Sequence, residues 1–91
     1  MIIKTIDIHG LTAVEAKSVI RAATKECLYR GNNVELMVIH GFNHGTAVRD
    51  TIARRYPAAW VMPENPGRSI IPVMINGRPA PRILREIELM N

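Results

Sequence analysis

Apolar and polar side chains alternate from Thr5 to His9, near the start of the chain. Ile6 and Ile8 fall on one face of an extended segment, whereas Asp7 and His9 fall on the other. This period of two predicts a β-strand over residues 2–8 with one buried face.

The pattern then changes to helical spacing. Thr12 is followed three residues later by Glu15, the arrangement of a capping box at a helix N-terminus. Apolar positions at helical intervals continue this segment roughly to Arg30, and Gly31-Asn32 provides a natural stop. We therefore expect the first helix over this range.

The same order of patterns recurs in the second half of the chain. The elements predicted there are a strand over residues 34–39, a helix that Thr46 caps and that runs to about Tyr56, a short strand over residues 60–62, and a strand over residues 69–75. Pro72 has no N–H for a strand ladder, which favours an edge position for the last of these. Trp60 is expected in the core.

The C-terminal segment carries two competing signals. Asn76-Gly77 is typical of a hairpin turn, while the apolar residues between positions 83 and 87 fit a short terminal helix slightly better. We expect a domain over residues 1–77, and a tail over residues 78–91 whose short helix packs on it.

These elements predict an α/β fold with the order β-α-β-α-β-β. The first strand, helix and second strand form a βαβ unit, so the two strands should be parallel with a right-handed crossover. The simplest arrangement is a two-layer sandwich, in which two helices cover one face of a four-stranded mixed sheet. The 91 residues leave room for one such domain.

Composition narrows the class of protein. Apolar residues make up 47% of the chain, which excludes a wholly disordered protein. The single cysteine, Cys27, excludes an intrachain disulfide and is expected to be a buried thiol. The first residues lack the apolar core of a signal peptide, and no apolar run is long enough to cross a membrane. We therefore expect a cytoplasmic protein that does not bind membranes.

The formal net charge is +4, and arginine leads the basic residues. A basic surface favours an acidic partner, of which nucleic acid is the commonest case. The alternative is that this charge only keeps a small protein dissolved.

Two His-Gly pairs end the first two predicted strands. His9-Gly10 and His40-Gly41 are each followed by a helix whose first turn contains Thr-Ala-Val. If the strands are parallel neighbours, both pairs lie at the edge that holds the carboxyl ends, where open α/β sheets usually bind ligands. Residues 31 positions apart would then be adjacent in space.

The chemistry at these pairs suits a phosphate. Glycines let the backbone approach a ligand closely, and the helix that begins behind Gly45-Thr46 offers free N–H groups. The histidines His9, His40 and His44 can carry protons near neutral pH, and Asp7 could orient one of them. Alternatively, these histidines are structural and Asp7 only caps the backbone.

A metal site is a further alternative. Asp7 and the three histidines offer a carboxylate and imidazoles, which suit zinc or manganese. The cofactor is therefore left open, with a divalent metal as the candidate.

The two corners resemble the motifs of a known family. The first segment, Ile6-Asp7-Ile8-His9-Gly10, resembles the Leu-Asp-Leu-His-Gly motif that opens small MutS-related (Smr) domains. The second, His40-Gly41 followed by Gly45-Thr46-Ala47 and Arg49, resembles their His-Gly-x-Gly-x-Gly motif. The resemblance covers roughly residues 3–75.

The resemblance implies a βαβαββ domain similar to the C-terminal domain of translation initiation factor three. It also implies binding of structured nucleic acid and an endonuclease activity that nicks DNA or cleaves RNA. Asp7 and His9 match the functional pair of the first motif, while His40, Gly41 and Gly45 match the second.

The chain departs from the family pattern at three places. Asn43 replaces the middle glycine of the second motif, and Phe42 stands where a lysine is common. The late glycine-rich signature is replaced by residues 65–69. These departures bear on cleavage more than on fold.

We therefore expect a nucleic-acid-binding domain that acts as an endonuclease. Asp7 and His9 would serve as the general base, and His40 as the general acid or as a phosphate ligand. The remaining residues expected to bind phosphate are Gly10, Gly41, Asn43, His44, Gly45, Thr46, Arg49 and Arg68.

The expected partner is structured DNA or RNA, read by shape rather than by sequence, and Phe42 is the one candidate for base stacking. Two alternatives differ in class: a non-catalytic nucleic-acid or protein interaction module, and a small enzyme that depends on a metal or a phosphate ligand. The choice between DNA and RNA, and between monomer and homodimer, stays open.

Overall fold

The computed structural model describes residues 1–42 and 45–89. Strands and helices alternate through most of this range, as the sequence pattern predicts. In chain order the elements are β1 (Ile2–Asp7), α1 (Ala13–Cys27), β2 (Val34–Ile39), α2 (Gly45–Arg55), β3 (Trp60–Val61), β4 (Arg68–Ile75), β5 (Arg78–Pro79) and α3 (Ile83–Glu88).

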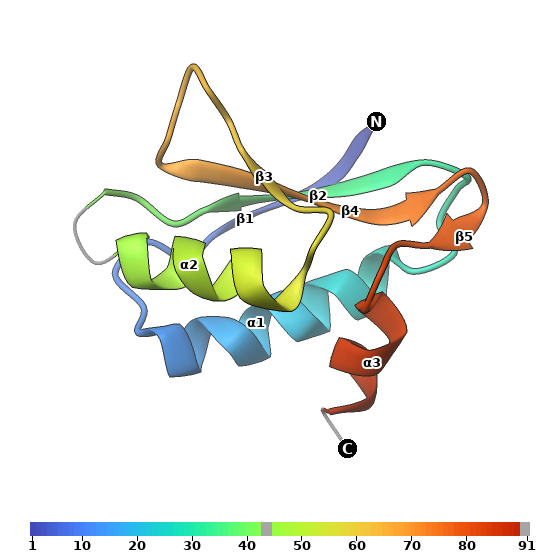
Figure 1. Ribbon diagram of the computed structural model, residues 1–91, viewed down its shortest axis with the longest axis horizontal. Coiled ribbons are helices and arrows are strands. Elements are labelled where there is room, and N and C mark those ends of the chain that lie inside the picture. The colour runs from blue at the N-terminus through green and yellow to red at the C-terminus, as the bar shows by residue number, and fades with distance from the viewer. Residues whose placement is uncertain (43–44, 90–91) are drawn as a thin grey trace.

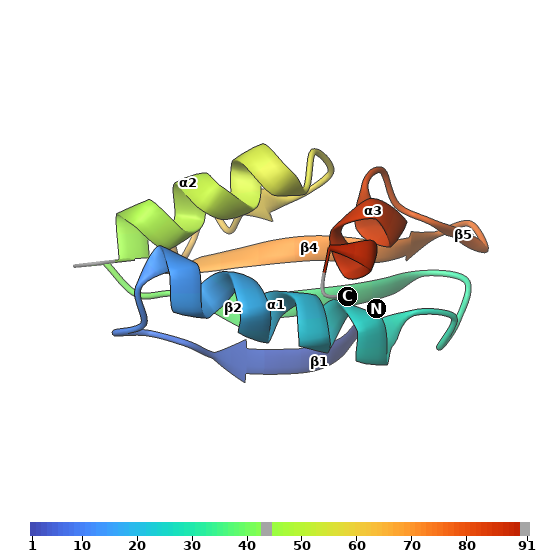
Figure 2. The same ribbon diagram turned by 90° about the horizontal axis from the view of Figure 1, so that it is seen from below.

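The strands form one mixed sheet in the order β1-β2-β4-β3, and the short β5 pairs with β4. β1 and β2 are parallel, whereas the other pairs are antiparallel. Figures 1 and 2 show that all three helices cover the same face of the sheet. The predicted two-layer α/β fold is confirmed, with β5 as an additional strand.

The strand alternation sets which side chains face the helices. Ile8 is buried on the helix side, and Lys4 on the same side of β1 reaches Glu26 of α1 with 2.8 Å between Nζ and Oε2. Asp7 and His9 have the opposite parity and are exposed on the face that carries no helix. We call this second face the open face.

The core lies between the sheet and the helix layer. Its almost completely buried members come from α1, β2, α2, β4 and α3 and from the segments that join the elements, and Ile6 of β1 packs against them. They include Ile8, Ala16, Ile20, Ala23, Cys27, Val34, Leu36, Val38, Val48, Ile52, Ile71, Val73 and Ile83. Cys27 is a buried free thiol, as predicted, and burial raises its pKa.

The start of α1 is confirmed and its end is corrected. The Thr12 hydroxyl accepts from the backbone N–H of Glu15, whose side chain accepts from the N–H of Thr12, so both bonds of the capping box are present. The helix ends at Cys27, short of Arg30, because Leu28 adopts an extended backbone and packs against the core.

The start of α2 is two residues earlier than predicted, because a helix capped by Thr46 would begin at Ala47. The helix begins at Gly45, so Thr46 lies inside the first turn and the prediction that it caps the helix is wrong. The position that would cap the helix lies outside the described residues. At the other end Tyr56 is buried and its N–H still donates to Ile52, as expected for a helix that runs to about this point.

The edge position predicted for Pro72 is wrong in one respect. β4 is an inner strand, with β2 on one side and β3 and β5 on the other. However, β3 pairs with β4 only through Ser69 and Ile70, and β5 pairs only from Met74 onward. Pro72 therefore sits in the gap between two short strands, where that side of β4 has no ladder for it to interrupt.

The C-terminal segment contains both the turn and the helix that its sequence predicts. Asn76-Gly77 turns the chain between β4 and β5, and α3 follows with Ile83 buried in the core. Residues 78–89 thus contribute a strand and a core helix to the same fold. In the part of the chain that the structure describes, no helix is long and apolar enough to span a membrane.

Candidate functional site

The two His-Gly corners are neighbours, as the parallel arrangement predicted. Asp7 is in register with Ile39, and the N–H of Ile8 donates to the carbonyl of Ile39 over 2.9 Å. A Cβ placed on Gly41 would lie 3.3 Å from the Cβ of His9. The second corner therefore packs directly against the first, and Gly41 leaves just enough room for His9.

Asp7 and His9 form a short hydrogen-bonded pair at this edge. Nδ1 of His9 lies 2.6 Å from Oδ1 of Asp7, and the same oxygen accepts from the backbone N–H of His9 over 3.2 Å. Both side chains are exposed, at 53% for Asp7 and 72% for His9. The pair is thus held by two bonds and still faces the solvent.

The bond changes how both groups titrate. The hydrogen bond from His9 lowers the pKa of Asp7, and the nearby charge of Arg68 lowers it further. The hydrogen bond to Asp7, followed by its negative charge, raises the pKa of His9 above 6.5. Because Asp7 holds Nδ1, the other ring nitrogen of His9, Nε2, is the one left for a substrate.

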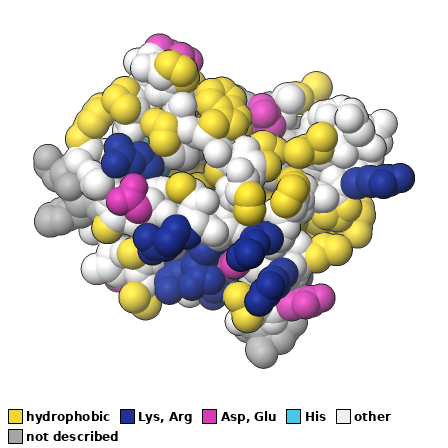
Figure 3. All heavy atoms as spheres, in the orientation of Figure 1, with side chains coloured by type: hydrophobic (Ala, Val, Ile, Leu, Met, Phe, Trp, Pro, Cys, Tyr) yellow, Lys and Arg dark blue, Asp and Glu magenta, His cyan; other side chains and the backbone are white. Residues whose placement is uncertain are grey.

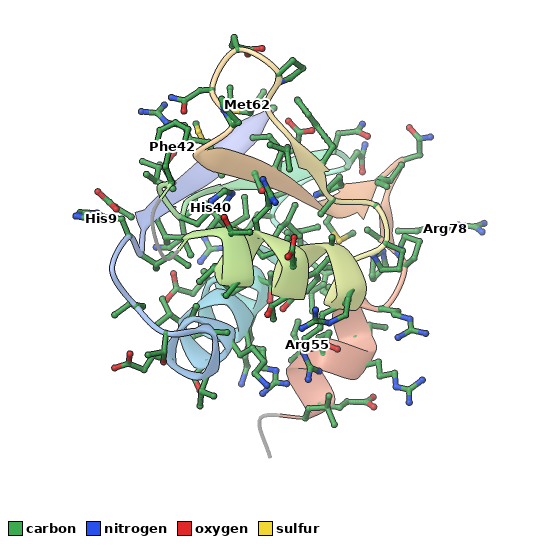
Figure 4. All side chains as sticks on the ribbon, turned by 60° about the vertical axis from the view of Figure 1, so that its left-hand side comes forward. His9, His40, Phe42, Arg55, Met62 and Arg78 are labelled. Carbon is green, nitrogen blue, oxygen red and sulfur yellow. The ribbon has the colours of Figure 1, made fainter. Side chains whose placement is uncertain are left out.

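His40 is placed quite differently. It has the same parity as Leu36 and Val38, so its ring lies on the helix side and is 2% exposed. Figure 4 shows His40 between the sheet and α2, while His9 lies at the outer edge. The sheet therefore separates the two imidazoles, although their backbones are adjacent.

Both nitrogens of His40 have partners inside the protein. Nδ1 donates to the carbonyl of Gly41 over 3.1 Å, which leaves Nε2 to accept from the hydroxyl of Ser69 over 2.9 Å. Burial lowers the pKa of His40, and the positive charge of Arg49 acts in the same direction. Both ring nitrogens of this buried imidazole are thus bonded inside the protein.

The second corner is also tied to the loop between β3 and β4. The carbonyl of Gly67 accepts from the N–H of His40 over 2.9 Å and from that of Gly41 over 3.0 Å. The ring of Phe42 covers the same glycine, and a Cβ on Gly67 would lie 3.1 Å from it. The two loops therefore hold Phe42 in place.

Arg68 lies in the same row of the open face as Asp7. The register pairs Asp7 with Ile39 and Ile39 with Arg68, so the three side chains follow one another across three strands. Nη1 of Arg68 lies 3.9 Å from Sδ of Met37, a neutral partner. Within residues 1–42 and 45–89 Arg68 takes part in no ion pair.

Two hollows flank the corners. A small one of about 210 Å³ lies between the Phe42 loop and α2, and its lining includes His40, Gly41, Phe42, Thr46 and Arg49. A wider groove of about 720 Å³ separates the first turns of α1 and α2, and its lining includes Gly10, Thr12, Thr46 and Asp50. Four of the residues expected to bind phosphate thus line hollows, namely Gly10, Gly41, Thr46 and Arg49. Arg68 instead belongs to the open face.

Some sequence candidates fall outside what the structure describes. Asn43 and His44 lie in the undescribed segment, and Gly45 is placed only as the first residue of α2. Among the described residues no group of three or more His, Cys, Asp or Glu side chains could hold a metal ion. Within residues 1–42 and 45–89, Asp7 and His9 therefore have no third side chain of these types beside them.

Sequence reasoning missed two contributors. Ser69 was treated only as the start of a strand, although its parity with Ile71 and Val73 places it on the helix side, beside His40. Trp60, expected in the core, is 46% exposed because β3 is a two-residue strand at the border of the sheet. Its position next to a turn-rich segment was the available signal.

The charge is unevenly distributed around these groups. On the side that Figure 3 shows, most Lys and Arg side chains lie over the helices, and the region above the sheet is largely apolar. Arg49 and Arg54 of α2 belong to the helix layer, and Nε of Arg49 lies 3.5 Å from Asp50. The basic side chains in this view thus gather mainly on the helix layer.

Comparisons with protein-family models, with curated proteins and with solved structures found no match to this chain.

Proposed function

We propose that this chain is a nucleic-acid-binding domain whose Asp7–His9 pair acts on a phosphodiester bond. The observation that carries the proposal is the 2.6 Å contact between Nδ1 of His9 and Oδ1 of Asp7 at an exposed edge of the sheet. A carboxylate that fixes one ring nitrogen of a histidine leaves the other nitrogen oriented for proton transfer.

The surroundings of the pair suit a phosphate substrate. Arg68 lies one strand beyond Ile39 in the same row, and its guanidinium could pair with a phosphate oxygen. Gly41 leaves the backbone beside His9 uncovered by a side chain. The net charge of +4 would add long-range attraction for a polyanion.

In the proposed reaction neutral His9 takes a proton through Nε2 from water or from a ribose hydroxyl. The resulting oxygen attacks phosphorus, the bond from phosphorus to the leaving oxygen breaks, and the leaving oxygen takes a proton from water. Asp7 stabilises the imidazolium that forms, and Arg68 offsets charge on the phosphate. His40 holds the shape of the second corner through Ser69 and Gly41, and takes no proton from the substrate.

Membership of the Smr family remains part of this proposal. It rests on the Asp7-Ile8-His9-Gly10 segment and on the His40-Gly41 corner, which the fold brings together.

The test has two stages. Dye-labelled branched DNA, duplex DNA and structured RNA are titrated with the protein at several salt concentrations, and we expect binding that weakens steeply as salt rises. The wild type, His9→Ala and Asp7→Ala are then incubated with each bound nucleic acid. Loss of cleavage in both variants supports the proposal, whereas equal cleavage by all three proteins shows contamination. Absence of binding at low salt contradicts it.

A second candidate is a binding module without catalysis. The observation that favours it is the internal bonding of His40, which leaves the second corner without an exposed acid in the described residues. In that case the wild type binds tightly and the nucleic acid stays intact after long incubation.

A further inference from the structure

The chain has four aromatic residues, and the structure separates them clearly. Tyr56 is buried, whereas Phe42, Trp60 and Tyr29 are exposed by 66%, 46% and 66%. Tyr29 follows the end of α1, at the opposite end of that helix from the corners. Phe42 covers Gly67 just before β4, where it also lines the small hollow beside α2, and Trp60 pairs with Ile70 at the far border of the same strand.

Trp60 belongs to a row of apolar side chains on the open face. It is in register with Ile70, which in turn pairs with Met37. Ile70 is buried, yet it is absent from the core between the sheet and the helices, so it is covered from the open side. Trp60 therefore lies with Met37 and Ile70 on the face that has no helix.

Arg68 separates the two exposed aromatic rings. It lies two residues before Ile70 on β4, which places its row about 7 Å from the row of Trp60. On the other side Arg68 follows Gly67, the residue that the ring of Phe42 covers. Figure 4 shows Phe42 beside the sheet near Met62, whose N–H donates to the carbonyl of Arg68.

The carboxylates on this face are already compensated. Asp7 is bonded to His9, and Oε1 of Glu35 lies 3.8 Å from the N-terminal ammonium of Met1. Arg68, by contrast, forms no ion pair among the described residues, and its side chain makes one polar contact there, to the sulfur of Met37, although its charge also acts on Asp7. A ligand crossing the face would thus meet one guanidinium charge between two aromatic rings.

From this arrangement we propose that the open face binds an unpaired single strand of nucleic acid. Its bases stack on Phe42 and Trp60, a phosphate between them pairs with Arg68, and the strand continues to the Asp7–His9 pair. Aromatic rings beside a basic group are the usual platform for unpaired bases. A duplex keeps its bases stacked on each other, so it cannot use these rings.

This inference rests on the proposed function and narrows its substrate class from structured nucleic acid to its single-stranded parts. It also gives Trp60 a role that the fold does not require. The second possible occupant of an apolar sheet face, another copy of the chain, is an outcome of the test below.

The test uses the full chain and three labelled probes: a short single-stranded DNA of mixed sequence, the matching RNA, and the matching DNA duplex. Trp60 is the only tryptophan, so its fluorescence reports directly on the open face. We expect the fluorescence of Trp60 to be quenched by the single-stranded DNA, by the RNA or by both, and to change little with the duplex. Comparing the two single strands tells DNA from RNA. This readout needs no variant and does not depend on how substitutions fold.

Phe42→Ala and Trp60→Ala are then compared with Tyr29→Ala, an equally exposed ring far from the face. We expect Kd for the single strand to rise about tenfold for each of the first two variants and to stay unchanged for the third. Thermal unfolding checks that all three variants are folded.

The outcomes separate the two proposals. If single strand and duplex bind equally and Trp60 fluorescence does not move, the stacking proposal is wrong while binding to nucleic acid stands. If no probe binds at low salt, the proposed function itself fails. If the mass in solution doubles with concentration and Trp60 becomes shielded as it does so, a second copy occupies the face and the stacking proposal is overturned.

Discussion

The hydroxyl of Ser69 donates to Nε2 of His40 over 2.9 Å, and this buried bond joins β4 to β2 behind the second corner. The carbonyl of Gly41 fixes the tautomer of His40, because it can only accept from Nδ1 and so leaves Nε2 as the acceptor for Ser69. A serine that faces the core is therefore bonded to the histidine of the second corner.

Replacing Ser69 by alanine should lower the free energy of unfolding by roughly 1–3 kcal/mol, since it leaves a buried ring nitrogen without its donor. Urea denaturation measures this loss. Ser18→Ala, at an exposed position on α1, serves as the control and should change stability by less than about 0.5 kcal/mol. Equal stability of the two variants would show that the bond contributes little.

The two described histidines should titrate on opposite sides of pH 6.5. Asp7 raises the pKa of His9, whereas burial lowers the pKa of His40. An NMR titration of the imidazole signals should therefore resolve them. In Asp7→Asn the pKa of His9 should fall toward 6.5 and that of His40 should stay put. Coincident titration of the two rings in the wild type would contradict the structure.

Stability should fall as acid is added, because of His40. Its folded pKa lies below the 6.5 expected of the unfolded chain, so below pH 6.5 the unfolded state binds a proton that the folded state does not. The contribution of His40 to the free energy of unfolding is therefore complete above pH 6.5, and it is lost as the pH falls toward the pKa of His40 in the folded protein. His9 acts in the opposite sense, since its pKa is raised.

The measurement is thermal unfolding as a function of pH in the wild type and in His40→Asn, whose amide keeps a donor near the Gly41 carbonyl. The wild type should lose more stability on acidification than the variant. If the wild type and His40→Asn lose stability equally on acidification, another group causes the loss of stability at low pH.

Gly41→Ala should disturb the candidate site more than Gly10→Ala does. Both glycines have positive φ, at +77° and +86°, so an alanine is strained at either position. Only at Gly41 would the new Cβ also meet a neighbour, the Cβ of His9 at 3.3 Å, because nothing lies within 4 Å at Gly10. We expect Gly10→Ala to lower the free energy of unfolding by about 1 kcal/mol, and Gly41→Ala to lower it by more.

NMR gives the site-specific readout for this pair. The imidazole signals of His9 should shift more in Gly41→Ala than in Gly10→Ala, even though Gly10 is its neighbour in sequence. The reverse order would contradict the packing of the two corners.

Glu86 anchors α3 to the other helices. Its buried carboxylate lies 3.5 Å from Nε of Arg21 on α1 and 3.4 Å from Nη1 of Arg55 on α2. Glu86→Gln should cost roughly 1–3 kcal/mol, below the full cost of breaking a buried pair because both arginines are partly exposed. Glu88→Gln, exposed on the same helix, is the matched control, and urea denaturation is the measurement.

Side-chain periodicity predicted most of the fold. Alternation at Ile6 and Ile8 placed β1 correctly, and the spacing of Thr12 and Glu15 marked the start of α1 at the right residue. These signals are local, so the sequence carries them in full. The adjacency of the two corners was predicted on the condition that the two strands of the βαβ unit are parallel neighbours, and the pairing of β1 with β2 meets that condition.

The sequence did not show which corner faces solvent. The period of two that buries Leu36 and Val38 also extends to His40, but two histidines at one predicted edge favoured chemistry over a structural role. Trp60 shows the converse, because the size of its ring predicts burial while the length of β3 decides its exposure. Both outcomes depend on neighbouring strands and are therefore tertiary.

The gap at Pro72 has a consequence for how this sheet resists aggregation. Between β3 and β5 one side of β4 is uncovered, and a strand from another molecule could add there by main-chain pairing. Proline brings no N–H to this stretch and so weakens it as a template. At the opposite border, β1 has a register shift between Ile2 and Lys4. This irregularity and the charge of Lys4 make β1 a poor edge for pairing with a strand of another molecule.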